Sequence, residues 1–147
     1  MDFETRKALD TDIDFLVRLR ELTMSQYLQA VGWPTDRESF LSRIHYCFEA
    51  AQIVEINGRP AGLFKACFLE EKKQWYIFQI QVHPDYQGLK IGSRLIEKLI
   101  ERATRDKVDV GLSVLKSNPA RTLYLRLGFE PVADVGEEIE MFYRTAQ

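Results

Sequence analysis

The sequence predicts an α/β protein, a three-layer α/β/α sandwich around a sheet of mixed strand direction. Strand-like segments alternate with segments of helical periodicity, and the longest strand candidate, residues 74–82, is largely apolar on both faces. A strand of that kind is typical of the centre of a sheet covered on both sides. The 147 residues suit one compact unit, so we expect a single domain over residues 1–147.

The first third of the chain is expected to hold a strand and two helices. Residues 3–9 are a weak strand candidate. A capping pattern at Thr11–Asp14 predicts a helix, which Gly32-Trp33-Pro34 interrupts. A capping box at Thr35–Glu38 predicts a second helix, with apolar residues at helical spacing from 40 to 48.

The middle of the chain predicts three successive strands. Residues 53–56 and 61–69 flank Asn57-Gly58, a strong hairpin signal because both residues tolerate positive φ. Residues 74–82 form the third strand, and Pro84 ends it because proline cannot donate to a strand ladder.

The last third predicts two helices and three strands. After a loop at residues 85–90, a helix begins at Ile91 with one apolar and one charged face. A strand at 108–115 follows. Asn118-Pro119 then opens a short helix as cap and first residue, and Gly128 ends it.

Two final strands, residues 132–135 and 139–143, are predicted to form a hairpin around Gly136. The predicted order of elements is therefore β-α-α-β-β-β-α-β-α-β-β.

The charge balance argues against some partners. The chain has 20 Lys and Arg against 22 Asp and Glu, a formal net charge of -2, so it has no global basic footprint for nucleic acid and no polybasic membrane anchor. We find no apolar signal core at the start and no apolar run long enough for a bilayer, and we expect a cytoplasmic protein. Cys47 and Cys67 lie in apolar stretches and are expected to be buried thiols, with no disulfide framework.

The most informative segment is the turn that joins strand 74–82 to the helix beginning at Ile91. A helix N-terminus carries unpaired backbone N–H groups and a partial positive charge. Gly88 and Gly92 let a ligand approach that backbone closely. These features suit a pyrophosphate. The pattern alone fits equally well a purely structural turn, in which the glycines only let the chain enter the helix.

This segment resembles the GNAT superfamily of N-acetyltransferases, whose signature is Gln/Arg-x-x-Gly-x-Gly/Ala. Gln87 and Gly92 match it, while Lys90 replaces the middle glycine. The resemblance implies a mostly antiparallel sheet, and it implies that the turn binds the pyrophosphate of acetyl-coenzyme A through its backbone amides. The residues so assigned are Gln87, Gly88, Leu89, Lys90, Ile91, Gly92 and Ser93.

A second segment, from Ser117 to Phe129, resembles the family's motif Asn-x-x-Ala-x-x-Leu-Tyr-x-x-x-Gly-Phe. The segment contains every fixed residue of that motif, except that the gap between Asn118 and Ala120 is one residue shorter than in the motif. The resemblance places Asn118 and Tyr124 beside the cofactor. Without it, Tyr124 would be read as a core aromatic residue. With it, Tyr124 is the expected general acid that protonates the departing thiolate.

The general base is not evident from the residues. Many relatives use a glutamate on the central strand, where this chain has Gln79 and Gln81. Glu21 is the weak candidate, and Glu70 and Glu140 are less favoured, because a solvated carboxylate is the commoner state of each. Water relayed to a distant carboxylate, or an amine of low pKa, would also serve.

The resemblance further implies direct attack of an amine on the thioester. Backbone groups of Ile80, Gln81 and Val82 would bind the pantetheine arm, and an amide there would polarise the carbonyl. The acceptor is expected to be a small molecule or a peptide amine, in a pocket lined by side chains such as Tyr27, Trp33 and Tyr143. Dimers are common among relatives, so a homodimer is compatible with the resemblance.

Two other functions are considered. A noncatalytic acyl-CoA sensor or interaction module of the same fold fits the missing strand carboxylate, although a binding module has no use for an acid at Tyr124. A phosphotransferase fits poorly, since there is no Walker lysine or pair of magnesium carboxylates. His45 and His83 have no partner at metal-ligand spacing, and we predict no metal.

Overall fold

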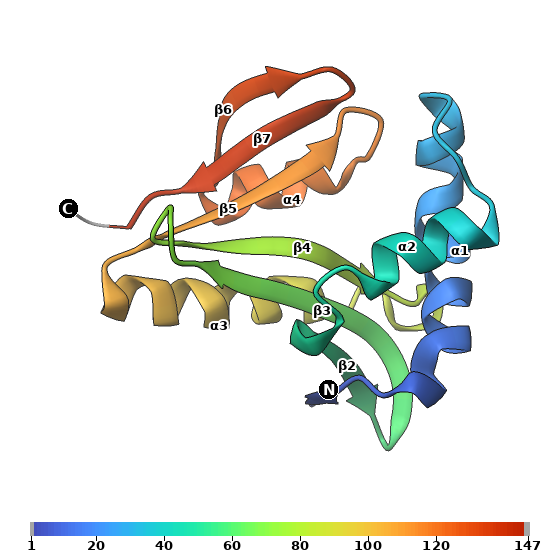
Figure 1. Ribbon diagram of the computed structural model, residues 1–147. Helices are drawn as coiled ribbons and strands as arrows, with labels where there is room; N and C mark the ends of the chain where they lie inside the picture. Colours follow the sequence, from blue (N-terminus) through green and yellow to red (C-terminus); the bar gives the residue numbers. More distant parts are fainter. Residues whose placement is uncertain (1, 146–147) are drawn as a thin grey trace. The chain divides into compact units, whose positions relative to one another are not determined.

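The computed structural model describes residues 2–145, and its elements follow the predicted order (Figure 1). They are β1 (Glu4–Lys7), α1 (Ile13–Ala30), α2 (Arg37–His45), β2 (Ala51–Ile56), β3 (Arg59–Leu69), β4 (Gln74–Val82), α3 (Ile91–Asp106), β5 (Asp109–Leu115), α4 (Ala120–Leu127), β6 (Glu130–Val135) and β7 (Glu138–Tyr143). The predicted bounds of β4 and the predicted start of α3 are confirmed.

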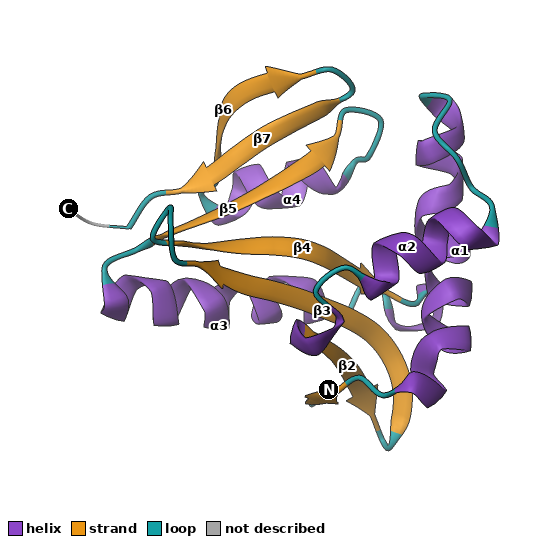
Figure 2. Cartoon of the chain, in the orientation of Figure 1, coloured by secondary structure: helices purple, strands orange, loops and turns teal. Residues whose placement is uncertain are grey.

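The seven strands form one sheet in the order β1-β2-β3-β4-β5-β7-β6. Figure 2 shows the strands in orange and the helices in purple. β4 pairs with β5 in parallel, whereas β1–β2, β2–β3, β5–β7 and β6–β7 pair antiparallel. The fold is thus of the predicted α/β class, with a mixed, mostly antiparallel sheet.

The hairpin between β2 and β3 forms where the sequence predicts it. Asn57 has φ 53° and Gly58 has φ 75°, so both residues of the two-residue turn lie in the left-handed region. That conformation matches the twist of the flanking strands, which explains the strength of an Asn-Gly signal.

The predicted caps of the first two helices are wrong. The side chain of Asp12, one residue after Thr11, accepts a hydrogen bond from the Leu9 amide at 2.8 Å and forms a salt bridge with Arg6 at 2.8 Å. This carboxylate fixes a 3₁₀ turn before α1, so the box at Thr11–Asp14 does not form. The cap of α2 is Asp36, whose carboxylate accepts from the Ser39 amide at 3.1 Å.

Helix α2 also ends earlier than its apolar spacing predicts. Tyr46 is extended and Cys47 has φ 53°, so the chain leaves the helix after His45. Phe48 lies in a separate 3₁₀ turn. Cys47 and Cys67 were expected to be buried thiols, but each is only partly buried; neither forms a disulfide within residues 2–145.

The chain divides into two compact units, and each is discontinuous in sequence. The first contains Met1–Lys65 and Gln79–Gly92; the second contains Ala66–Phe78 and Ser93–Gln147. The first unit has a core of apolar side chains from α1, α2, β2 and β3, which includes Leu16, Leu19, Phe40, Ile44, Ile53 and Leu63.

In the second unit both helices pack on the same face of the strands. The guanidinium of Arg102 on α3 lies 4.8 Å from the ring of Trp75 on β4, and the ring of Phe129, just after α4, lies 5.7 Å from that of Tyr143 on β7. Trp75 pairs with Val110, and Val110 pairs with Tyr143, so these three residues share one face. The next row, Tyr76 with Gly111 and Phe142, therefore lies on the opposite face.

Candidate functional site

The turn from β4 into α3 is held by its own polar groups. The 3₁₀ turn Pro84–Tyr86 follows β4, and the Tyr86 amide donates to the His83 carbonyl at 2.8 Å. The side-chain amide of Gln87 donates to the Val82 carbonyl at 3.0 Å, which ties the turn back to the end of the strand. Gln87 thus fixes the loop in this structure with its own side chain.

The backbone amides after Gln87 are available to a ligand. Within residues 2–145, the amides of residues 88–93 have no hydrogen-bond acceptor from the protein. The last four of these are the orphan donors of a helix N-terminus. The first turn of α3 contains no acidic residue, so no carboxylate offsets the positive end of the helix dipole. The arrangement suits an anion with several oxygens.

Lys90 occupies the position where the signature has glycine. Its φ is 61°, a left-handed conformation that glycine adopts without strain. Gly88 also has positive φ, at 87°. The backbone therefore keeps the conformation that a glycine would favour, and the substitution adds a cationic side chain to the turn.

Strands β4 and β5 stop pairing before either strand ends. Their parallel ladder runs from Gln74–Asp109 to Ile77–Leu112, whereas β4 continues to Val82 and β5 to Leu115. Within residues 2–145, this ladder does not include Ile80, Gln81 or Val82, whose backbone we predict to bind the pantetheine arm. An extended ligand could pair with such an edge.

Two buried glutamines replace the expected strand carboxylate. Gln79 is 4% exposed and Gln81 is 6% exposed. Within residues 2–145, neither the carboxamide nitrogen nor the carboxamide oxygen of Gln79 has a hydrogen-bond partner, and the side-chain oxygen of Gln81 has none either. Buried polar atoms of this kind are normally satisfied by water or a ligand. Neither side chain is basic enough to act as a general base.

Helix α4 begins one residue later than predicted, at Ala120. Asn118 nevertheless has the predicted capping role, because its side-chain oxygen accepts a hydrogen bond from the Ala120 amide at 2.9 Å. Gly128 ends the helix with φ 107°. These contacts fix the backbone on both sides of Tyr124.

Tyr124 is 7% exposed, and its ring lies 6.1 Å from that of Phe129. Burial raises the pKa of the Tyr124 phenol to about 12. The phenol therefore stays protonated well above neutral pH, which is the state required of a proton donor. Ile80–Gly92 lie in the first unit, whereas Ser93, Asn118 and Tyr124 lie in the second.

The three base candidates have different surroundings. Glu21 is exposed on α1. Glu70 follows β3 and lines a pocket in the second unit. Glu140 on β7 is half-buried, and its carboxylate accepts a hydrogen bond from the Ser113 hydroxyl at 3.1 Å. Ser113 was not singled out from the sequence, because a lone serine in a strand gives no local signal of its partners.

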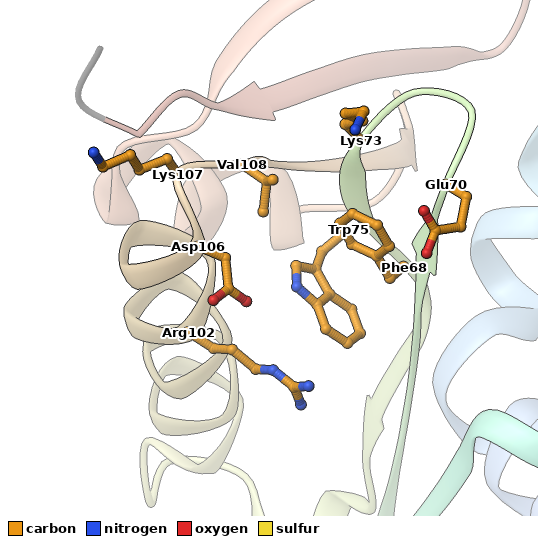
Figure 3. Close-up of a pocket in the computed structure, with 8 residues that line it drawn as sticks. All are labelled: Phe68, Glu70, Lys73, Trp75, Arg102, Asp106, Lys107 and Val108. Atoms are coloured by element: carbon orange, nitrogen blue, oxygen red, sulfur yellow. The ribbon is translucent and has the colours of Figure 1, made fainter.

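The pocket that contains Glu70 measures about 600 Å³ and lies beside Trp75 and the last turns of α3 (Figure 3). Cationic and anionic side chains line it together, including Lys73, Arg102 and Asp106. None of its lining residues belongs to the predicted cofactor site.

The aromatic residues proposed to line an acceptor pocket belong to both units, Tyr27 and Trp33 to the first and Tyr143 to the second. Tyr27 on α1 is half-buried, and Trp33 is 39% exposed. Tyr143 lies on the face that packs against α4, where its ring approaches Gly128 and Phe129. Within residues 2–145 there is no group of three metal-ligating His, Cys, Asp or Glu side chains. No helix in that range is both long and apolar enough to cross a bilayer.

The mixed sheet and the unpaired amides of the turn that leads into α3 agree with the fold of acyl-CoA-dependent acyltransferases. The family model described as the acetyltransferase (GNAT) family matches residues 16–129, and the chain belongs to that family. The match covers both signature segments found in the sequence.

Individual relatives agree with this assignment. The chain is 38% identical over 87 residues to an uncharacterised N-acetyltransferase from Methanocaldococcus jannaschii, a region that covers 53% of this chain and 38% of that protein. The chain thus spans well under half of that relative's length.

Solved structures share the fold at low identity. A PaiA N-acetyltransferase from Thermoplasma acidophilum in complex with coenzyme A has a TM-score of 0.76 at 15% identity, with 98% of this chain and 99% of that chain covered. N-acetylglutamate synthase from Neisseria gonorrhoeae, complexed with coenzyme A and N-acetyl-glutamate, has a TM-score of 0.69 at 17% identity, with 100% of this chain and 36% of that chain covered.

Proposed function

We propose that this protein is an N-acetyltransferase that transfers an acetyl group from acetyl-CoA to a primary amine of a small molecule or peptide. The observation that carries the proposal is the row of backbone amides at residues 88–93, which have no acceptor within the described chain. Membership of the GNAT family and the coenzyme A in two structural relatives support the same ligand. The family match spans both compact units, which supports their acting as one catalytic domain.

The cofactor would be held by backbone groups more than by side chains. The amides of residues 88–93 would bind the diphosphate, and Lys90 would add a positive charge beside it. The unpaired edge of β4 at Ile80–Val82 would bind the pantetheine arm. Acetyl-CoA supplies the thioester carbonyl carbon that the amine attacks.

Tyr124 would then complete the transfer. Attack of a neutral amine on the thioester forms a C–N bond and breaks the C–S bond, and the departing thiolate needs a proton. The Tyr124 phenol, whose pKa burial raises to about 12, remains protonated and can supply it. No acyl-enzyme is required in this sequence.

The binding half of the proposal is tested by Gly92→Glu. The new carboxylate would lie in the first turn of α3 and repel the diphosphate, so we expect acetyl-CoA affinity to fall at least about 30-fold, which corresponds to about 2 kcal/mol. Arg105→Glu is the control, because it places an acid in the last turn of the same helix. Calorimetry should show near-normal affinity for that control. Normal affinity in Gly92→Glu would reject the loop assignment.

The catalytic half is tested by Tyr124→Phe. Loss of the proton donor should lower kcat by about 100-fold while acetyl-CoA affinity stays within a few-fold of wild type. A free-thiol assay over a panel of amines measures kcat. An unchanged kcat in a chemistry-limited assay would remove Tyr124 as the acid.

A noncatalytic acyl-CoA-binding module is the second candidate. Gln79 and Gln81 favour it, because the strand carries two neutral carboxamides where relatives use a carboxylate. Tight acetyl-CoA binding with no turnover on the amine panel, together with an unaffected Tyr124→Phe protein, would select this module over the enzyme.

A further inference from the structure

The pocket of about 600 Å³ beside Trp75 is lined entirely by residues of the second unit (Figure 3). These residues come from the end of β3, the turn that leads into β4, the start of β4, and the last turns of α3 with the segment that follows them. The volume lies in the range of roughly 300–1,000 Å³ that is usual for small-molecule sites. The proposed transfer reaction uses none of the lining residues, so a ligand bound here would be additional to acetyl-CoA and the acceptor amine.

One wall of the pocket is aromatic. The rings of Phe68 and Trp75 meet edge to face with their centroids 5.7 Å apart, and Val108 adds an aliphatic side chain. All three residues are only half-buried, so part of their apolar surface is exposed to water. Covering such surface with an apolar group is favourable. The wall therefore suits a ligand with an apolar or aromatic side chain.

A second wall carries a cation and an anion one helical turn apart. Arg102 and Asp106 are both exposed on α3 at the spacing i, i+4, which brings the Cβ atoms of such a pair to about 5–6 Å. Figure 3 shows both side chains projecting from the helix on the side that faces Trp75. Opposite charges at this spacing commonly form a salt bridge.

The two charges do not neutralise each other. Within residues 2–145, neither Arg102 nor Asp106 forms a salt bridge. The central carbon of the Arg102 guanidinium lies instead 4.8 Å from the centre of the Trp75 ring. A helical pair in which the cation precedes the acid is the weaker of the two orders, because each charge then lies toward the unfavourable end of the helix dipole. The cation–π contact with Trp75 replaces the salt bridge.

Each of these side chains complements one charge of a ligand. The N–H groups of Arg102 have no acceptor within the described part of the chain, and a guanidinium matches a carboxylate through two parallel hydrogen bonds. Asp106 is the last residue of α3, where the helix dipole disfavours a carboxylate and a cation beside it would be stabilising. Together they fit a ligand whose carboxylate and ammonium groups are a few ångströms apart.

The remaining charges of the lining argue against simpler ligands. Glu70 and Lys73, in the turn between β3 and β4, add an acid and a base, and neither forms a salt bridge with any residue that the structure describes. The ammonium group of Lys107 is directed away from Trp75 (Figure 3). A plain anion would be repelled by the two carboxylates of the lining, and a metal ion would be repelled by its cations. A ligand that carries both charges gains from both.

We propose that this pocket binds a free α-amino acid with a large apolar or aromatic side chain. Its carboxylate pairs with Arg102 and its ammonium group pairs with Asp106. Its side chain covers the rings of Phe68 and Trp75. Each terminus of a peptide carries only one of the two charges, so the pocket selects the free amino acid. This inference goes beyond the proposed transferase function and does not depend on it, because the pocket shares no residue with the predicted cofactor site.

Calorimetry with L-phenylalanine tests the ligand class, with acetyl-CoA absent so that no transfer takes place. We expect saturable binding with a Kd of about 1 mM or tighter. N-acetyl-L-phenylalanine lacks the ammonium group, L-phenylalaninamide lacks the carboxylate, and glycine lacks the ring. Each should bind at least about 10-fold more weakly than L-phenylalanine. Equal binding of all four compounds, or no saturable binding of L-phenylalanine up to about 10 mM, would overturn the proposal.

Two charge-removing variants test which residue holds which end of the ligand. Arg102→Gln and Asp106→Asn alter exposed side chains, so both proteins should fold, and each should weaken L-phenylalanine binding at least about 10-fold. Arg102→Gln should leave the affinity for L-phenylalaninamide unchanged, because that analogue has no carboxylate. Asp106→Asn should not weaken N-acetyl-L-phenylalanine, because that analogue has no ammonium group. Equal losses for L-phenylalanine and both analogues would contradict these pairings.

Matched controls lie on the same helix. Glu101 and Arg105 are exposed on α3 and do not line the pocket. Glu101→Gln and Arg105→Gln should keep the affinity for L-phenylalanine within about 2-fold of wild type. Losses as large as those of Arg102→Gln and Asp106→Asn would show a general effect of the charge on α3 and would overturn the site.

The fluorescence of Trp75 shows whether the amino acid binds in this pocket. The chain has two tryptophans, so Trp33→Phe leaves Trp75 as the one indole fluorophore. L-phenylalanine should change its emission with the midpoint that calorimetry gives, and adding Arg102→Gln should raise that midpoint at least about 10-fold. Calorimetric binding without any change in Trp75 emission would mean that the amino acid binds elsewhere, and would overturn the proposal while leaving the transferase function untouched.

Discussion

The ammonium group of Lys65 donates a hydrogen bond to the backbone carbonyl of Arg43 at 3.0 Å. Lys65 lies in β3 and is 0% exposed, and its ammonium group also reaches the carbonyls of Ile44 and Tyr46. Helix α2 ends at His45, so these acceptors are carbonyls at its C-terminal end, where intrahelical donors are lacking. A buried cation from a strand therefore caps a helix.

Lys65→Met should destabilise the protein by about 2–4 kcal/mol. Methionine fills similar space but removes the donor that reaches these three carbonyls, of which the Ile44 bond is buried, and removes the charge that complements the helix dipole. Urea unfolding measures the change in the free energy of unfolding. Lys72→Met, at an exposed position in the turn after β3, is the control and should change stability by less than about 0.5 kcal/mol. An equal effect of the two substitutions would contradict the capping role.

Elements with strong local signals are the ones that the sequence predicts well. The Asn57-Gly58 turn, the strand that ends before Pro84 and the amphipathic helix beginning at Ile91 all carry their own signals within a few residues. The predicted caps at Thr11 and Thr35 are wrong because the neighbouring aspartates, Asp12 and Asp36, accept the backbone hydrogen bonds in their place. At the first of these sites, the choice of Asp12 is reinforced by a salt bridge from Arg6 in β1.

The same distinction between local and long-range signals applies to the candidate site. The turn around Gln87 could be found from the sequence because its glycines, its strand and its helix are contiguous. The hydrogen bonds that join Ser113 to Tyr76 and Glu140 could not, because they depend on the register of three strands, which no local pattern specifies. Burial of Lys65 was equally hidden, since a lone lysine in a strand is usually solvated.

Replacing the two left-handed lysines that flank α3 should separate backbone strain from ligand binding. Lys90 has φ 61° and Lys107 has φ 58°. Glycine adopts these φ values without the steric conflict that a Cβ atom causes. Lys90→Gly and Lys107→Gly should therefore each raise the free energy of unfolding by up to about 1 kcal/mol. Thermal unfolding would detect this change.

Only Lys90→Gly should also affect the ligand. It removes a cation from the turn that we propose binds the diphosphate, so acetyl-CoA affinity should fall about 3-fold, whereas Lys107→Gly should leave the affinity unchanged. Equal affinities for both variants and wild type would show that the Lys90 side chain does not contact the phosphates.

Gly128 is constrained by a neighbouring ring as well as by its backbone. Its φ is 107°, and a Cβ atom there would lie 2.9 Å from Cε2 of Tyr143. Gly128→Ala should therefore cost about 2–4 kcal/mol of stability. Gly136→Ala is the matched control, because Gly136 has φ 61° with nothing within 4 Å of an added Cβ, and should cost about 1 kcal/mol. Similar losses in chemical denaturation would show that Tyr143 moves aside freely.

The buried phenol of Tyr124 should make stability depend on pH in the alkaline range. Its pKa is raised from 10.0 to about 12 in the folded protein, so the folded state holds this proton more tightly than the unfolded state does. The resulting stabilisation is complete below pH 10 and is lost as pH rises from about 10 to about 12. At pH 11 the loss attributable to this residue is about 1.4 kcal/mol.

Tyr124→Phe removes the titrating group. Between pH 8 and pH 11, the free energy of unfolding of wild type should therefore fall by about 1.4 kcal/mol more than that of Tyr124→Phe. Tyr46→Phe, at a residue that is 54% exposed, keeps the Tyr124 phenol and should retain the wild-type slope. Urea titrations at the two pH values measure both differences. The same pH dependence in wild type and Tyr124→Phe would mean that water reaches the phenol in solution. Tyr124 would then ionise nearer pH 10. It would be a weaker candidate for the general acid, which must stay protonated in a closed site.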